Sequence, residues 1–411
     1  RHDADTERLA QDLRKLCEHH IRFFGEPAPM ERYLFQVMAV GDGYGGLEHR
    51  SSTSLLCSRN DLPRRTARKM SEEYRRFLGL CSHEYFHTWN VKRIMPAAFQ
   101  PYDLTREVHT TLLWAFEGIT SYYDDLALVR AGIISRDDYL ELLGQNVTRL
   151  LRGSGRLKQS VAESSFDAWT KYYKQDENAP NSVVSYYTKG GLIALALDLT
   201  IRRATDNARS LDDVMRALWE RHGKTGIGVT EEGLERLIEE VSGVPLQPFF
   251  DQALRGTEDL PLAELLGHVG VEFHLRPAES ATDKGGKPAA RDESELAALP
   301  SLGIRTGDDP AGAKVINVFD GGAAQEAGVS AGDVILAIDG LRATHTNLEG
   351  LLASRVPGDR IKVHLFRRDE LMEFDVTLRA APHDTCYLRQ QPDLDAATQA
   401  RLASWLGGGN G

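Results

Sequence analysis

Two histidines four residues apart, with a glutamate directly after the first, stand in the segment HEYFHTWN. From Ser71 to about Val91 the apolar residues recur at helical spacing. On a helix, residues i and i+4 share one face, so His83 and His87 can direct their imidazoles at one ion. Glu84 lies further round the helix, where it can reach a metal-bound water but not easily the metal. This is the H-E-x-x-H arrangement of zinc hydrolases, and it requires a further ligand beside this helix.

The motif needs support from elsewhere in the sequence, because it fixes only three positions and can match by chance on an ordinary polar helix. A catalytic zinc ion takes three protein ligands and keeps one position open. The downstream segment WAFEGITSYY offers Glu117 among apolar neighbours, where a carboxylate must be paired or must bind a metal. His83, His87 and Glu117 are therefore predicted to bind one Zn²⁺ ion. The alternative is an ion pair between Glu117 and an arginine.

Composition narrows the class of protein. The chain has 411 residues, 41% hydrophobic and 27% charged, which is typical of a globular protein of two or three domains. A net charge of −11 argues against nucleic acid or an anionic membrane as a partner. No apolar run approaches the roughly 20 residues that span a bilayer. Four scattered cysteines without a CxxC pair exclude a zinc ribbon and are compatible with a reducing compartment, which favours the cytoplasm. The chain begins at Arg1, so we expect a processed or truncated protein.

The order of predicted elements indicates a multidomain α+β fold. A β-containing start is followed by helices, and a stretch rich in Ala, Gly, Pro and charge at 277–299 precedes a β-rich region. The predicted strands are 33–40, 51–58, 313–319, 332–340 and 359–378, with a glycine-rich turn at 41–46. The predicted helices are 5–24, 71–91, 105–130 with Thr105 as N-cap, 136–152, 190–206, 209–221, 230–241, 347–355 and 395–406. We predict a mainly helical domain at 1–268, a β-rich domain at 269–382 with 277–299 as a flexible insertion, and a tail at 383–411 with a short helix.

Several segments together resemble the glycyl aminopeptidase family of PDZ-bearing gluzincin metallopeptidases. They are HEYFHTWN, the following VKRI, and EGITSYY at 117–123. The resemblance extends from about residue 5 to residue 380. It implies a thermolysin-like catalytic domain and an aminopeptidase that acts on peptides with a free N-terminus and prefers small N-terminal residues, glycine and alanine. Members of this family usually carry an N-terminal β-rich domain, and this chain starts where that domain would end.

The resemblance also assigns roles in substrate binding. GYGGLEHRSS resembles the Gly-x-Met-Glu-Asn exopeptidase loop of the related aminopeptidase-N family. The match implies that Glu48 holds the α-amine of the substrate and that Gly45 and Gly46 let the peptide backbone approach. Leu47 and His49 depart from the Met and Asn of that pattern.

Further roles concern the reaction itself. YYTKGG resembles the Tyr-x-Lys-Gly element of the same superfamily, which implies that Tyr187 donates its hydroxyl to the oxyanion, with Tyr186 as the alternative register. Glu84 is expected to act as the general base. Asp124 and Asp125 are candidates to orient the histidines, although we favour solvent-facing charges for both.

Residues 301–340 resemble a PDZ domain. SLGI stands where such domains carry the loop that binds a peptide carboxylate, which would comprise Leu302, Gly303 and Ile304. A PDZ domain binds peptide C-termini by adding a strand to a sheet edge. Ser301 replaces the first glycine of the usual loop. The alternative is a module that packs on the catalytic domain and binds nothing.

Two other functions stay open. One is an endopeptidase of the same metal class, and the other is a PDZ adaptor on an inactive peptidase scaffold. Trp89 and Trp114 are predicted to lie in the core, and Asn90 and His109 receive no role.

Overall fold

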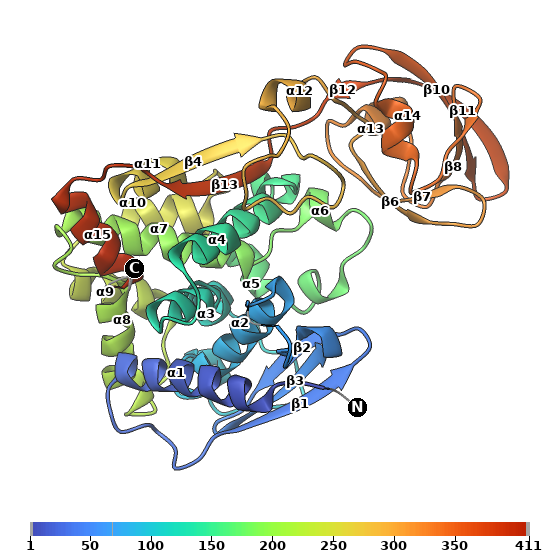
Figure 1. The fold of residues 1–411 in the computed structure, drawn as a ribbon. Helices are drawn as coiled ribbons and strands as arrows, with labels where there is room; N and C mark the ends of the chain where they lie inside the picture. Colours follow the sequence, from blue (N-terminus) through green and yellow to red (C-terminus); the bar gives the residue numbers. More distant parts are fainter. Residues whose placement is uncertain (1–2, 68, 408–411) are drawn as a thin grey trace.

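The computed structural model describes residues 3–67 and 69–407, and it has a helical body, a small sheet at its base and a separate β-rich unit (Figure 1). The longer helices of the body are α1 (Thr6–Phe24), α2 (Glu72–Phe86), α3 (Ile119–Arg130), α4 (Arg136–Leu151), α7 (Thr188–Ala204), α8 (Leu211–Leu218) and α9 (Glu231–Ser242). Its shorter helices are α5 (Val161–Phe166), α6 (Ala179–Ser182), α10 (Gln247–Phe250) and α11 (Leu262–His268). The mainly helical domain followed by a β-rich region confirms the predicted fold class.

The small sheet contains the two strands predicted near the start of the chain. Its strands are β1 (Leu34–Val40), β2 (Tyr44–Glu48) and β3 (Ser52–Ser58), in the order β1-β3-β2. β3 pairs with β1 in parallel and with β2 antiparallel. The second half of the predicted glycine-rich turn is therefore the start of β2, an edge strand that packs against α2.

Helices α2, α3 and α7 pack together in the core of the helical body, and aromatic side chains of these and neighbouring segments fill it. Trp89 and Trp114 are fully buried there, which confirms their predicted place. Trp89 stacks on Phe24 of α1 with ring centroids 4.8 Å apart. Buried aromatic area of this kind stabilises helix packing and fixes the position of α2.

The helix predicted from Thr105 to Arg130 begins later than expected. Residues 105–111 are mostly irregular, and a short π-helix, η3 (Trp114–Gly118), leads into α3. No helix begins directly after Thr105, so it does not act as an N-cap, and its N–H donates to Asp103 Oδ1 in a local turn. The Thr110 hydroxyl donates to Glu231 Oε1 at 2.6 Å, and the Thr111 amide also donates to that carboxylate, so this segment is tied to α9 instead.

The C-terminal segment belongs to the helical body. β4 (Val271–Arg276) pairs antiparallel with β13 (Thr385–Gln390), and α15 (Ala396–Leu406) packs on α3. Trp405 is fully buried, and its indole N–H donates to Tyr122 Oη at 2.9 Å. The structure thus puts β4 and the predicted tail with the peptidase-like body, whereas we predicted β4 within the 269–382 domain and the tail as a separate segment.

The β-rich unit has its own sheet and its own core. Its sheet follows the order β11-β10-β8-β7-β6, with β9 paired to β8. The strands are β6 (Ile304–Asp308), β7 (Ala313–Val318), β8 (Val334–Ile338), β9 (Leu341–Arg342), β10 (Arg360–Arg367) and β11 (Glu370–Thr377). Helices α13 (Ala323–Ala327) and α14 (Leu348–Leu352) cover it, and β5 (Pro300–Ser301) pairs with β12 (Arg379–Ala380) at its entry and exit.

The segment 277–299 follows a packed course, although we expected a flexible insertion. The buried Arg276 guanidinium binds Asp283 at 2.6 Å and the Lys287 carbonyl at 2.9 Å. The Gly286 amide donates to the Cys386 carbonyl at 2.7 Å. A short helix, α12 (Glu293–Ala297), completes the segment.

Polar contacts join the β-rich unit to the helical body. The buried side chain of Asn181 donates to the Val318 carbonyl at 2.7 Å and accepts from the Asp320 amide at 3.0 Å. Asn317 donates to the Glu177 carbonyl at 2.8 Å. These contacts fix the end of β7 against the segment that precedes α7. Among the described residues, no helix has the length and apolar character needed to cross a membrane.

Candidate metal centre

Helix α2 places the two histidines. Ser71 caps its start by accepting from the Tyr74 amide at 3.1 Å, and acidic residues fill its first turn, where the helix dipole favours them. The helix ends at Phe86, but His87 keeps helical dihedral angles and its amide donates to the His83 carbonyl. The two imidazole rings therefore lie on one face with centroids 4.6 Å apart.

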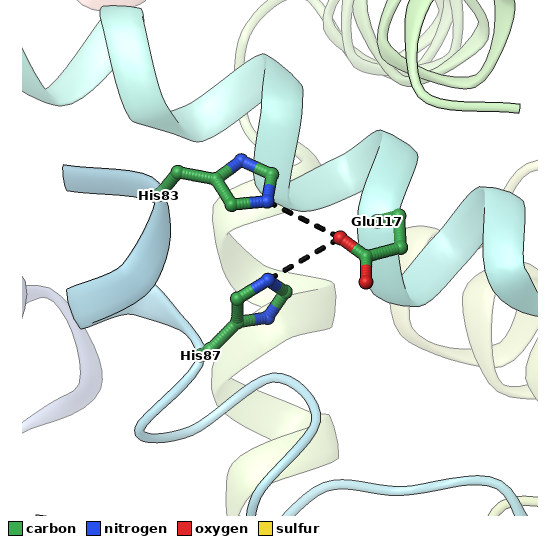
Figure 2. A group of neighbouring side chains, drawn as sticks. All are labelled: His83, His87 and Glu117. Carbon is green, nitrogen blue, oxygen red and sulfur yellow. Dashed lines mark hydrogen bonds and ion pairs between the residues drawn. The ribbon is translucent and has the colours of Figure 1, made fainter. Parts of the chain in front are cut away.

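Glu117 comes from the neighbouring π-helix η3 and points at both rings (Figure 2). Its Oε2 lies 3.2 Å from His83 Nε2 and 3.3 Å from His87 Nε2. The structure thus brings the three predicted ligands together, with their ligand atoms within 4.8 Å of one another. Burial favours the neutral form of Glu117, but His87 and His83 outweigh this and bring the pKa of its carboxyl down to about 2.

The outer nitrogen of each imidazole has its own partner. His83 Nδ1 lies 3.1 Å from Asp124 Oδ2, and His87 Nδ1 lies 2.6 Å from the Asn90 carbonyl oxygen. When each Nδ1 carries the proton and donates, each Nε2 has a free lone pair directed at the other predicted ligands. Asp124 therefore contacts His83, whereas we expected it to face solvent. Asp125, for which we expected the same, is partly buried.

Sequence reasoning named Asp124 as a candidate to orient a histidine but favoured a solvent-facing charge, and it gave Asn90 no role. Asp124 follows Glu117 by two helical turns, so its place on the same side of the helix was available as a signal. Asn90 acts through its backbone carbonyl, which no side-chain pattern reveals. Its side chain holds the loop by donating to the Ala115 carbonyl at 3.1 Å.

Glu84 lies against the edge strand β2. Its side chain is buried, and within the described part of the chain its Oε2 has no hydrogen-bond partner. A Cβ added to Gly46 would lie 2.1 Å from Glu84 Oε1, so the carboxylate keeps this position only beside a glycine. Burial raises the pKa of Glu84, and the nearby His87 and His83 imidazoles oppose that rise.

Glu48, at the end of β2, also approaches the centre. Oxygens of Glu48 and Glu84 and a nitrogen of His87 lie within 4.8 Å of one another. Glu48 Oε1 forms an ion pair with Lys92 Nζ at 3.0 Å, which the sequence did not predict. A cavity of about 220 Å³ adjoins this pair and is lined by His49, Arg50, Lys92, Met95 and Tyr102. Nothing among the described residues lies within 4 Å of a Cβ placed on Gly45, so the strand is open there.

Tyr187 borders the centre because α7 and η3 cross in close contact. A Cβ on Gly118 would lie 2.6 Å from Gly190 Cα, so these two glycines allow the backbones to meet. The Tyr187 ring lies 6.2 Å from the His83 ring, while the Tyr186 ring is buried behind it. The geometry favours Tyr187 over Tyr186 as the residue that faces the centre. Burial and the Glu117 carboxylate raise the pKa of Tyr187, so its hydroxyl keeps its proton.

The predicted carboxylate loop lies at the edge of the β-rich sheet. Leu302 is buried, and Gly303 has a φ of +71°, a left-handed conformation that favours glycine. Ile304 begins β6, the edge strand beside which a peptide could add.

Comparisons with known proteins agree with this geometry. The sequence profile of the M61 glycyl aminopeptidase family matches residues 76–193, and that of the PDZ domain matches residues 300–378. An aminopeptidase N family protein from Idiomarina loihiensis, known from its crystal structure, is 44% identical with a TM-score of 0.92. The alignment covers 99% of this chain and 67% of that chain. No curated protein matches the chain.

Two further solved structures match only a small part of the chain. The HtrA-type protease AlgW with a decapeptide is 23% identical, and the serine endoprotease from Yersinia pestis is 25% identical. Each alignment covers 21% of this chain and 30% of the other, with TM-scores of 0.20 and 0.19. These TM-scores are too low to indicate a shared overall fold. The chain is 44% identical to the Idiomarina loihiensis protein over 99% of its own length, and the family profile spans the candidate metal centre. The chain therefore belongs to the M61 glycyl aminopeptidase family.

Proposed function

We propose that the chain is a zinc-dependent aminopeptidase that hydrolyses the first peptide bond of peptides with small N-terminal residues, glycine and alanine. The observation that carries the proposal is the convergence of His83, His87 and Glu117 on one point. The family supports the peptidase activity and the small-residue preference. The PDZ match supports a second peptide-binding site for C-termini at Leu302, Gly303 and Ile304.

The donor set fits zinc. Ligand atoms about 2.0–2.1 Å from a tetrahedral Zn²⁺ ion lie roughly 3.4 Å from one another. Glu117 Oε2 lies 3.2 Å and 3.3 Å from the two histidine nitrogens, close to that separation. Two imidazoles and one carboxylate leave the fourth position of a catalytic site open. When bound, Zn²⁺ would supply a Lewis acid that polarises the scissile carbonyl and acidifies the attacking water.

Glu84, Tyr187 and Glu48 lie around this point and can carry out proton transfer, oxyanion stabilisation and substrate binding. Glu84 Oε2, which has no hydrogen-bond partner among the residues that the structure describes, can accept a proton from the attacking water and pass it to the leaving amine. The Tyr187 hydroxyl can donate to the oxyanion, and one such donor typically contributes about 3–4 kcal/mol to lowering the barrier. Glu48 can bind the α-ammonium of the substrate, which limits cleavage to the first peptide bond.

The Glu48–Lys92 ion pair favours a second candidate function, an endopeptidase of the same class. Lys92 already neutralises the carboxylate that would hold the free amine. If Lys92 stays in place when substrate binds, the free N-terminus gains less from Glu48, and N-blocked peptides become competitive.

One substrate panel tests the proposal. The protein is stripped with a chelator, reloaded with Zn²⁺, and assayed on glycyl, alanyl and leucyl reporters, each free and N-acetylated. We expect activity only after reloading, and on the free glycyl and alanyl compounds. Equal turnover of the N-acetylated compounds would establish the endopeptidase instead. If the protein binds one metal ion per chain but turns over no reporter, it is an inactive peptidase scaffold.

Two substitutions separate the roles. Glu84→Gln should bind Zn²⁺ at the wild-type ratio but lose turnover, because the amide cannot accept the proton. Glu48→Ala should raise KM for free-amine reporters far more than for any N-blocked substrate. Equal losses on both substrates would remove Glu48 from the amine site.

A further inference from the structure

Four tyrosines form a cluster beside the candidate metal centre. Tyr186 and Tyr187 precede α7, and Tyr172 and Tyr173 lie on a short 3₁₀ turn, η5 (Tyr172–Lys174). The rings of Tyr186 and Tyr187 stack 4.6 Å apart, and Tyr172 packs on Tyr186 at 4.8 Å. Of these four, Tyr187 is the one that takes part in the proposed reaction, as the oxyanion donor.

Tyr173 has an unusual combination of exposure and contact. The residue is 65% exposed, yet its hydroxyl turns inward to lie 2.9 Å from Tyr187 Oη. An exposed phenol has water as an alternative partner, so this inward contact needs a reason. The Tyr186 hydroxyl donates to Tyr173 Oη across 3.4 Å.

Counting protons shows which direction of the hydrogen bonds leaves the proton of Tyr187 free. Each phenol has one proton to donate. Tyr186 uses its proton on Tyr173, so Tyr173 is the acceptor there and has its own proton available for Tyr187. If Tyr173 donates to Tyr187, the proton of Tyr187 is not used within the cluster and can point at the reacting carbonyl. The opposite direction would consume the proton that the oxyanion needs.

We propose that Tyr173 is a positioning residue, which donates its hydroxyl proton to Tyr187 and thereby directs the proton of Tyr187 towards the substrate oxyanion. This inference rests on the proposed function of Tyr187. The hydrogen bond does two things: it fixes the rotation of the Tyr187 hydroxyl, and it polarises that hydroxyl as a donor, since successive hydrogen bonds strengthen one another. Tyr173 touches no substrate atom in this scheme and acts only through Tyr187.

A double-mutant cycle tests the coupling. Tyr173→Phe should lower kcat by roughly 3- to 10-fold, as expected for one net hydrogen bond, with KM unchanged. In a Tyr187→Phe background the same substitution should have no further effect, because the hydroxyl that Tyr173 directs is gone. Tyr172→Phe is the matched control, since this neighbour on the same turn pairs its hydroxyl with Ser185 Oγ at 3.3 Å and stands outside the chain of three. We expect its kcat to match that of the wild type.

A second measurement does not depend on activity. In the metal-free protein labelled with ¹³Cζ-tyrosine, the Tyr187 resonance is identified by its loss in Tyr187→Phe. It should move in Tyr173→Phe and stay in place in Tyr172→Phe. An unmoved resonance overturns the proposal, as does a full wild-type kcat in Tyr173→Phe. Equal kcat losses in both backgrounds also overturn it, because they indicate a general structural effect. If the wild type cleaves no reporter, the proposed function fails by itself, and the resonance alone decides whether Tyr173 bonds to Tyr187.

Discussion

The contact between Gly46 and Glu84 leads to a sharp prediction for Gly46→Ala. The new Cβ would lie 2.1 Å from Glu84 Oε1 and 2.4 Å from Glu84 Cδ, whereas ordinary contact begins at 3.4 Å. The carboxylate must therefore retreat by about 1.3 Å, the difference between 3.4 Å and 2.1 Å. Gly46 has no positive φ, so backbone strain does not contribute.

A displacement of about 1 Å in a catalytic group typically reduces the rate by about 100-fold. We expect Gly46→Ala to lower kcat by that factor, which corresponds to about 2.7 kcal/mol of barrier. The measurement is steady-state kinetics on a free glycyl reporter, together with metal content and the unfolding midpoint in urea. Both of these should stay near the wild-type values, since the three atoms nearest to the new Cβ all belong to Glu84.

Gly45→Ala is the matched comparison on the same strand. Among the described residues nothing stands within 4 Å of its new Cβ, so Glu84 keeps its place and any effect should fall on KM. A kcat for Gly46→Ala within about threefold of the wild type would refute the assignment of Glu84 as the base at this position.

Three further predictions test the supports of the site. Asp124→Ala removes the partner of His83 Nδ1, so metal affinity should fall about 10- to 100-fold in a chelator competition; an unchanged affinity would contradict the orienting role. Trp405→Ala should lower the free energy of unfolding by about 3–5 kcal/mol in urea, and a loss below about 1 kcal/mol would mean that α15 adds little to the core. Asn181→Ala removes the acceptor of the Asp320 amide, which should then exchange its hydrogen faster; unchanged exchange would show that other contacts dominate this interface.

The sequence predicted the parts of the site that depend on local geometry. The spacing of His83 and His87 fixes their common face wherever a helix forms. Glu117 stood out because a carboxylate among Trp114 and Phe116 needs a partner, and the structure supplies His83 and His87. These inferences need only the helical period and the cost of burying a charge.

The sequence did not predict what depends on distant contacts. The helix expected from Thr105 starts late because Glu231, far along the chain, binds Thr110 and Thr111. The ion pair of Lys92 with Glu48 joins two segments that no pattern links. The same holds for β4 and β13, whose pairing spans the entire β-rich unit and moves the domain boundary.

The paired ends of that unit have a practical consequence. Pro300 lies opposite Ala380, and Ser301 lies opposite Arg379, so the chain leaves the PDZ region at the point where it entered. Cutting the chain short before residue 300 would strip away β13 and Trp405 and expose the interior of the peptidase. Internal excision between Ser301 and Arg379, closed by a short turn, would spare both. The same junction could accept a foreign domain with neighbouring termini, which makes it a natural graft point in this enzyme.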